Sequence, residues 1–231
     1  MSALIELKNV DLSLGKDAAR VHILKGISLA IEAGEAVGLV GPSGSGKSSL
    51  LMVMAGLEQA DSGAVLIEGV DLSRMNEDAL AIFRGKRIGI VFQSFHLVPT
   101  MTARENVALP LELAGRDDAF QRAEAELRAV GLGDRLHHYP AQLSGGEQQR
   151  VAIARAVAPD PAIIVADEPT GNLDETNGTA IVDLLFALKR ERGATLVLVT
   201  HDASLAAKCD RTIRLRSGAI LAPEAARLAA V

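Results

Sequence analysis

Residues 41–48 read Gly-Pro-Ser-Gly-Ser-Gly-Lys-Ser, and this stretch decides the fold. It follows an apolar run over 35–40 and precedes an apolar, helix-type segment over 47–57. Glycines let successive backbone N–H groups turn towards one anion, and the next helix points its positive end at the same place. The pattern is that of a phosphate-binding loop, in which Lys47 reaches the β- and γ-phosphates and the Ser48 hydroxyl ligates Mg²⁺. Alone it predicts only a nucleoside triphosphate, and kinases and GTPases fit it equally well.

Two further apolar runs, over 162–166 and 195–200, predict buried strands. Buried strands separated by helical segments are typical of a parallel sheet covered on both faces, so the sequence predicts an α/β domain. The pattern predicts four more elements: strands over 4–14 and 64–68, a crossover helix over 179–190, and a closing hairpin over 211–221 that turns at Ser217-Gly218.

The segment over 94–161 differs in composition from the rest of the chain. It is rich in Ala, Leu, Glu and Arg and contains a long helical stretch over 117–130. We interpret it as a helical lobe inserted between the core strands. The 231 residues suit one such domain, so we expect a single domain over 1–231 with the lobe at about 94–161.

The overall composition and charge argue against some classes of protein. A formal net charge of −5 argues against a nucleic-acid binder that relies on phosphate neutralisation. Cys209 is the single cysteine, which favours a reducing cytosolic compartment. Because we find no signal-peptide pattern and no apolar run of spanning length, we expect a cytoplasmic chain that does not itself cross a bilayer.

An acidic pair, Asp167 and Glu168, follows the apolar run over 162–166. At the carboxyl edge of a parallel sheet both residues would face the phosphate loop. We expect Asp167 to hold Mg²⁺ through water, and Glu168 to polarise the attacking water as general base. The alternative, a solvated acidic turn before Pro169, fits the pair in isolation, but the phosphate loop earlier in the chain favours the Mg²⁺ site.

Residues 143–150 read Leu-Ser-Gly-Gly-Glu-Gln-Gln-Arg. Ser144 and Glu147 form a capping-box pattern, which predicts a helix that continues to about residue 158. Two glycines in the first turn cost a helix up to about 1 kcal/mol each relative to alanine, so they indicate a role beyond stability. Bare N–H groups at a positive helix end suit an anion, and a second chain that presents this helix to the γ-phosphate is the economical arrangement. A well-capped helix and nothing more is the alternative.

This segment resembles the signature sequence of the ABC ATPases, and the likeness extends over residues 4–221. Three other residues occur in the order of that family's motifs. Gln93 resembles the glutamine-loop residue that contacts Mg²⁺ and the membrane partner. Asp174 resembles the D-loop aspartate at the dimer interface, and His201 resembles the switch histidine that contacts the γ-phosphate.

The resemblance implies a P-loop NTPase (RecA-like) core of α/β class, with an N-terminal antiparallel β subdomain and an inserted helical subdomain. It implies an ATPase that uses ATP and Mg²⁺ in a head-to-tail homodimer. Each nucleotide would lie between the phosphate loop of one copy and the signature segment of the other. The implied catalytic residues are Glu168, His201 and Lys47, and the implied Mg²⁺ ligands are Ser48, Gln93 and Asp167. The implied nucleotide-binding residues are Gly41, Pro42, Ser43, Gly44, Ser45, Gly46, Lys47, Ser48, Ser49, Gln93, Ser144, Gly145, Gly146 and Asp174.

Residues 92–107 and 167–174 resemble the LolD-like and MacB-like branch of the family. Within that branch, residues 140–143 and 206–211 look closest to YbbA-like ATPases. This implies a separate permease of the MacB/FtsX type, driven from the inner face of the membrane in export, lipoprotein or lipid extraction, or mechanotransmission. A soluble ABC ATPase that acts on nucleic acid or ribosomes is the alternative. We expect the partner surface around Gln93 and residues 94–105, where Phe95, Leu97 and Val98 either contact a coupling helix or pack inside the lobe.

One position departs from the family pattern. The family usually places an aromatic residue near the N-terminus to stack on adenine, and by spacing this position falls near Leu14. Leu14 or His22 would pack on the base instead, so a strict preference for ATP over GTP is not implied.

Overall fold

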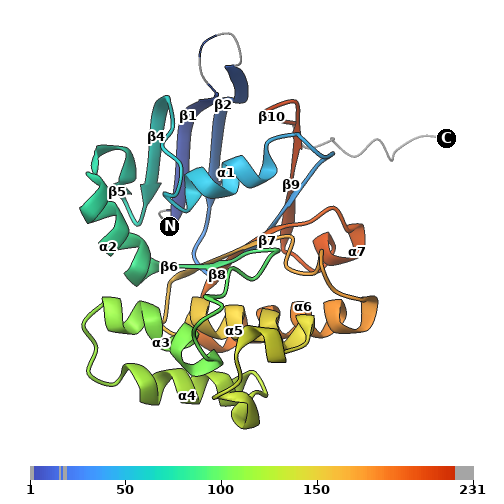
Figure 1. Cartoon of the computed structure of the whole chain (residues 1–231). Helices are drawn as coiled ribbons and strands as arrows, with labels where there is room; N and C mark the ends of the chain where they lie inside the picture. The colour runs from blue at the N-terminus through green and yellow to red at the C-terminus, as the bar shows by residue number, and fades with distance from the viewer. Residues whose placement is uncertain (1–2, 16, 18–19, 222–231) are drawn as a thin grey trace, which may run out of the picture. The chain divides into compact units, whose positions relative to one another are not determined.

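The computed structural model describes residues 3–15, 17 and 20–221. Its contacts divide the chain into two compact units (Figure 1). The first unit runs up to Arg74 and resumes at Leu198, and the second unit is Met75–Val197.

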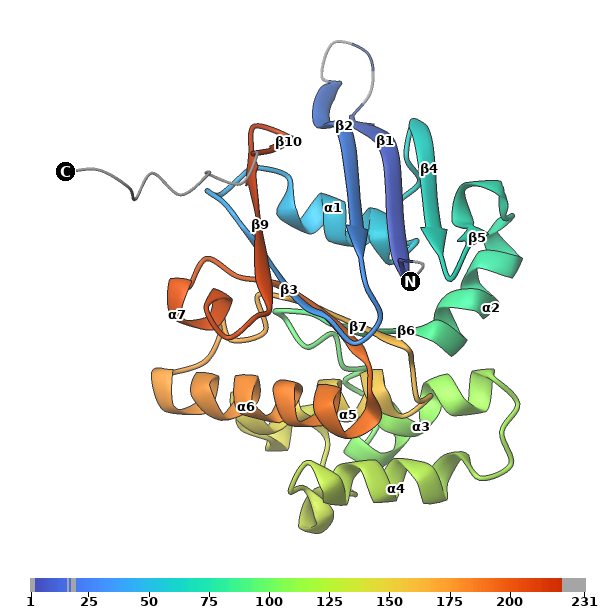
Figure 2. The same ribbon diagram turned by 180° about the vertical axis from the view of Figure 1, so that it is seen from behind.

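The first unit contains a four-stranded antiparallel sheet with the strand order β2-β1-β4-β5, which can be followed in Figure 2. Alternation buries Ile5, Leu7 and Leu12 of β1, and Ile5 lies opposite residues of both β2 and β4. The predicted strands over 4–14 and 64–68, and the antiparallel character of this region, are confirmed. The strands are β1 (Ile5–Leu14), β2 (Val21–Ile31), β4 (Ser62–Ile67) and β5 (Val70–Asp71), and a 3-10 turn, η2 (Leu72–Arg74), follows them.

Strand β2 was not predicted from the sequence because its alternation of apolar and polar residues is interrupted. The pairing of β1 with β2 shifts register at three places, and Gly26 within β2 has a φ of 60°. Each irregularity changes which side chains face inward, so the period of two is lost.

A second group of strands in the first unit includes β3 (Ala36–Val40), the strand that leads into the predicted phosphate loop. The buried strand β3 pairs in parallel with β9 (Arg211–Arg216), which pairs antiparallel with β10 (Ala219–Ile220). The predicted hairpin is confirmed, and its turn residues Ser217 and Gly218 both have positive φ, at 51° and 82°.

Helix α1 (Lys47–Met54) follows β3. It ends earlier than predicted because Gly56 adopts a φ of 64° and the N–H of Leu57 donates to the carbonyl of Met52, which closes the last turn.

The second unit combines parallel strands with helices. Strand β6 (Ile88–Val91) pairs in parallel with β7 (Ile163–Asp167), and β8 (Thr195–Val199) carries the chain back into the first unit, where α7 (Ala203–Ala206) follows. The predicted strands at 162–166 and 195–200 are confirmed. The helices of the second unit are α2 (Glu77–Arg87), α3 (Ala103–Leu113), α4 (Ala119–Ala129), α5 (Gly145–Val157) and α6 (Glu175–Arg192), with 3-10 turns η3 (Gly133–Arg135) and η4 (Pro140–Gln142).

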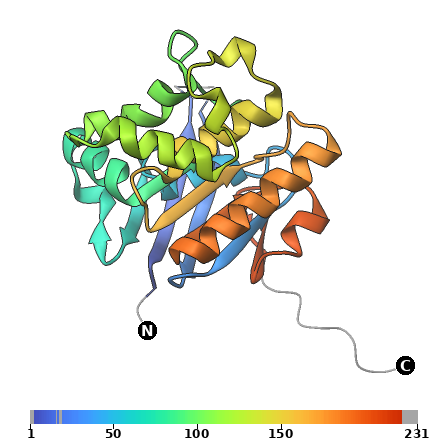
Figure 3. The same cartoon turned by 90° about the horizontal axis from the view of Figure 1, so that it is seen from below.

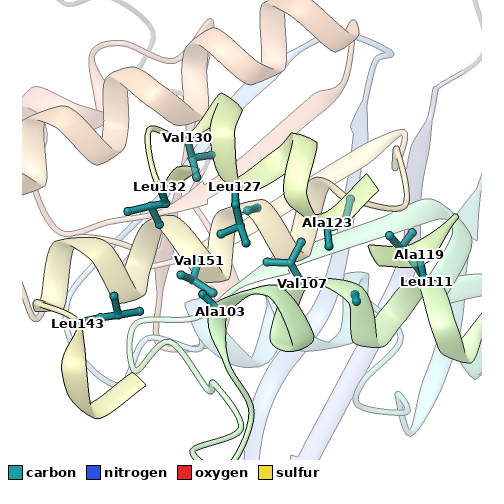
Figure 4. Packing of buried hydrophobic residues seen from close by; sticks show 13 residues of the cluster. Ala103, Val107, Leu111, Ala119, Ala123, Leu127, Val130, Leu132, Leu143 and Val151 are labelled. Atoms are coloured by element: carbon teal, nitrogen blue, oxygen red, sulfur yellow. The ribbon is translucent and has the colours of Figure 1, made fainter. Parts of the chain in front are cut away.

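Helices α3, α4 and α5 share one hydrophobic core (Figure 4). Val107, Leu127 and Val151, one from each helix, are fully buried in it. The predicted helices over 117–130 and from 144 onward are confirmed by α4 and α5, and the crossover helix by α6, drawn in orange in Figure 3. The prediction that 94–161 forms an inserted lobe of one domain stays a prediction.

Candidate functional site

The phosphate loop lies between β3 and α1 in the first unit. Gly46 caps α1 with a φ of 99°, and no side chain caps this end of the helix. Because its N-cap is a glycine, this helix has no N-cap side chain that would compete with an anion for its first turn. A methyl group at Gly41 would lie 2.2 Å from the carbonyl oxygen of Leu215, so the loop packs against β9 at a distance that only glycine permits.

Two polar side chains of this loop point inward. Lys47 is only 7% exposed, and its Nζ donates to the carbonyl oxygens of Gly41 and Pro42 at 3.0 and 3.1 Å. Ser45 Oγ is buried and makes no hydrogen bond within the described part of the chain. A buried ammonium, an unbonded hydroxyl and a bare helix end all suit a phosphate chain, so these residues fit a nucleoside triphosphate.

His201 lines the same hollow as the phosphate loop. This hollow has a volume of about 550 Å³, and Gly41, Pro42 and His201 all contribute to its wall. The neighbouring Thr200 donates its N–H to the carbonyl of Leu39 at 3.2 Å, which fixes His201 next to the end of β3. The structure therefore brings His201 and the loop together within the first unit.

Asp167 and Glu168 lie in the second unit, where Asp167 is the last residue of β7. Both are partly buried. Glu168 has a φ of 43°, a left-handed conformation that costs energy for a residue with a Cβ. The N–H of Gly171 donates to the carbonyl of Glu168 at 3.0 Å, so a tight turn holds this conformation. Strain of this kind is found preferentially at functional residues.

Gln93 lies against the segment that follows this turn. A methyl group at Gly171 would lie 2.6 Å from Nε2 of Gln93, and Asn172 Nδ2 donates to the carbonyl of Gln93 at 3.0 Å. The glutamine that follows β6 and the turn that follows β7 therefore form one cluster in the second unit.

Helix α5 begins with the predicted capping box. Glu147 Oε2 accepts from the N–H of Ser144 at 2.8 Å and from its Oγ at 2.9 Å, and Oε1 accepts from Arg135 Nε at 3.0 Å. The backbone hydrogen bond from Ser144, followed by the bond from Arg135, lowers the pKa of Glu147 to about 2. The carboxylate is therefore ionised at neutral pH and fixes the start of the helix.

Comparison with known proteins agrees with this arrangement. A family model described as ABC transporter matches residues 24–171, which is more than half of the chain. The chain belongs to the ABC transporter ATP-binding family. The ABC protein YbbA of Escherichia coli is 52% identical over 217 residues, which cover 93% of this chain and 95% of that protein. LolD of Geobacter metallireducens is 48% identical over 96% of this chain and all of that protein.

The fold is that of the ABC ATPases, which hydrolyse ATP. A solved dimeric structure of the cassette MJ0796, bound to ADP and Pi, matches with a TM-score of 0.88 and 41% identity. The match covers 94% of this chain and 97% of that one. Within the described ranges, no helix of this ABC protein has the length and apolar character needed to span a bilayer.

The glycines of the ABC signature segment have a structural role that the sequence analysis missed. A methyl group at Gly146 would lie 2.9 Å from Oδ1 of Asn177, and one at Gly145 would lie 3.3 Å from Cδ2 of Leu173. Leu173 and the first turn of α6 thus pack closely on the start of α5. A need for small residues there accounts for part of the pattern.

Asp174 also does more than the sequence indicated. Its Oδ1 accepts from the N–H of Asn177 at 2.9 Å, and its Oδ2 from Nδ2 of Asn177 at 2.6 Å. The backbone bond from Asn177 lowers the pKa of Asp174. The D-loop aspartate is therefore the N-cap of α6, which links the interface residue of the ABC resemblance to the rest of the second unit.

The region predicted for adenine stacking is apolar and exposed. Leu14 is 38% exposed and lies opposite Val21, which is 57% exposed, across the β1–β2 pair. His22 is held by Asp11, whose Oδ1 lies 2.9 Å from Nε2 of the histidine. Leu14 and Val21 therefore present a two-residue apolar platform, and Val21 is the member that sequence spacing did not identify.

The residues of the predicted partner segment, 94–105, differ in how far they are buried. Leu97 packs against the shared core of α3, α4 and α5, which agrees with the alternative that this residue packs inside the lobe. Phe95 is partly buried, and its Cζ lies 3.9 Å from the position of a methyl group at Gly145. Ser94 and Thr100 are exposed.

Proposed function

We propose that this chain is the ATP-hydrolysing subunit of an ABC transporter and works as a head-to-tail dimer with two ATP molecules between the copies. The observation that carries the proposal is the phosphate loop, whose uncapped helix end, buried Lys47 and unbonded Ser45 hydroxyl form one half of a phosphate site. Ser144, Gly145 and Gly146 of the second copy would supply the other half from the start of α5. The dimeric MJ0796 structure with ADP and Pi supports this arrangement by analogy.

The proposed chemistry assigns each polar residue a task. Glu168 accepts a proton from the attacking water, while Lys47 and His201 stabilise the charge that develops on the γ-phosphate. Ser48, Gln93 and Asp167 would hold Mg²⁺, which when bound neutralises charge on the β- and γ-phosphates. Loss of phosphate removes the bridge between the copies, so the dimer opens.

The experiment that tests this function replaces the base alone. We expect Glu168→Gln to bind ATP as wild type does, to release phosphate at least about 100-fold more slowly, and to accumulate as a dimer with MgATP. Phosphate release and light scattering after size exclusion measure these effects, with the exposed Glu191→Gln as the matched control. A Glu168→Gln protein that stays monomeric at saturating ATP contradicts the sandwich.

We further propose that residues 1–231 form a single ABC domain with a helical subdomain at about 94–161, and that it drives a separate MacB/FtsX-type permease at the inner face of the membrane. The identity to LolD, a protein named for lipoprotein release, supports this branch. A hollow of about 320 Å³ beside the proposed partner segment, lined by Phe92, His96 and Pro110 among others, offers a place for a permease element. Mass spectrometry of the proteins that co-purify from membranes tests it, and recovery with ribosomes alone would contradict it.

A further inference from the structure

Side chains of helix α5 form hydrogen bonds to the backbone of residues 92–96, which we call the clamped loop. Arg155 Nη2 donates to the carbonyl of Phe95 at 2.8 Å, and its Nη1 donates to that of His96 at 2.6 Å. Gln149 Nε2 lies 3.5 Å from the carbonyl of Phe92. Both side chains come from α5, so three of the five carbonyls of the loop are bonded to one helix.

The clamped loop needs such support because its backbone is strained. Phe95 and His96 have φ values of 60° and 49°, the left-handed region that residues with a Cβ rarely occupy. A planar guanidinium with donors in a fixed fork suits two neighbouring carbonyls. The rings of Phe92 and His96 also lie 4.8 Å apart and close the loop on itself.

Arg155 is an unusual choice for a purely structural residue. It is partly buried, and burial lowers the pKa of its guanidinium. It forms no salt bridge within the described part of the chain, so its charge is compensated there by backbone carbonyls. Because Arg155 has no carboxylate partner there, its role is to maintain the conformation of the clamped loop.

Helix α5 joins this clamp to the ABC signature. Ser144 is its N-cap, and Arg155 lies eleven positions further along the chain, which corresponds to about 16 Å along the axis. Residues 151–154 between them are fully buried, so a continuous, closely packed stretch of helix joins the two sites. We infer that Arg155 is a positioning residue through which a displacement at the signature segment is transmitted to the clamped loop. This rests on the proposed function, in which the loop adjoins the permease surface.

Hydrogen exchange of the isolated chain tests the inference. In the wild type, MgATP should slow exchange of the amides over 95–101, a range that leaves out Gln93, the proposed Mg²⁺ ligand. Arg155→Met should speed their exchange about tenfold without nucleotide and remove the response to MgATP, while the affinity for a fluorescent ATP analogue stays within about threefold. Arg155→Lys, which retains a donor, should recover part of the response. Arg128→Met, at an exposed arginine of α4, is the matched control and should behave as wild type.

The outcomes separate a clamp from a general loss of stability. Faster exchange in β7 as well as in 95–101 would show a general structural role and overturn the inference, as would a normal MgATP response of 95–101 in Arg155→Met. If Arg155→Met does not fold, Arg155→Lys decides, because an unchanged response there overturns the inference. Phosphate release by the wild type tests the proposed function separately, because its absence would contradict that function whatever the exchange of the Arg155 variants shows.

Discussion

Lys47 has two partners in its own loop, and this determines what its removal does. Its Nζ donates hydrogen bonds to the carbonyls of Gly41 and Pro42. Lys47 therefore stabilises the conformation of the phosphate loop and also supplies its positive charge. We expect Lys47→Ala to weaken ATP binding at least about 100-fold, because charge-assisted bonds to the phosphates and the bonds that stabilise the loop are lost together. Titration with a fluorescent ATP analogue measures the effect, and the exposed Lys25→Ala is the control. Unchanged affinity would contradict the role assigned to Lys47.

A second residue-scale prediction concerns Glu147 and pH. Its pKa is lowered from 4.5 to about 2 in the folded protein, so its stabilising contribution is complete above pH 4.5 and is lost as the pH falls towards 2. We expect Glu147→Gln to lower the free energy of unfolding by about 1 kcal/mol at pH 7, and the difference from wild type to shrink between pH 4.5 and 2. Urea unfolding at several pH values measures this. A difference that is constant across that range would contradict the assignment.

At these positions the sequence predicted the type of residue better than its contacts. The capping box of Ser144 and Glu147 follows from spacing along a helix, and spacing is visible in a sequence. The contact of Gly146 with Asn177 and the clamp of Arg155 on Phe95 depend on how distant segments pack, and no local pattern reports that. Val21 was missed for a similar reason, since its place opposite Leu14 depends on irregular register.

At the scale of elements, the connection from β3 to α1 depends on contact with β9. A methyl group at Gly41 would overlap the backbone oxygen of Leu215, whereas one at Gly44 meets nothing within 4 Å and only has to tolerate a φ of 73°. We expect Gly41→Ala to destabilise the protein by about 2–3 kcal/mol and Gly44→Ala by about 1 kcal/mol. Urea unfolding of the two variants without nucleotide compares them. Equal effects would mean that the loop does not pack on β9 as described.

Whether a helix or strand could be predicted from the sequence depended on how its residues are buried. Strands buried on both faces, such as β7 and β8, give continuous apolar runs that are easily recognised in a sequence. Helix α2 has no buried residue and so shows no clear apolar period, whereas α3 buries Ala103, Val107 and Leu111 at helical spacing but contains Pro110. Pro110 also weakens the helical signal by its own propensity, and the shared core with α4 and α5 overrides it.

At the scale of the whole molecule, the chain carries two helix starts suited to phosphate, at Gly46 and at Ser144, in different compact units. In the proposed dimer each nucleotide uses the first from one copy and the second from the other. The nucleotide then acts as a ligand of the dimer, and binding should stabilise the folded state by mass action.

This gives a prediction that needs neither the permease nor hydrolysis. With saturating MgATP, the Tm of Glu168→Gln should rise with protein concentration, because a tenfold increase favours a dimer by about 1.4 kcal/mol. Without nucleotide the Tm should not depend on concentration. Adding Lys47→Ala to Glu168→Gln should abolish the dependence, since that variant cannot form the first half of the site. If MgATP raises the Tm of Glu168→Gln equally at all protein concentrations, each copy binds its nucleotide alone, and the signature segment has no part in holding the phosphate.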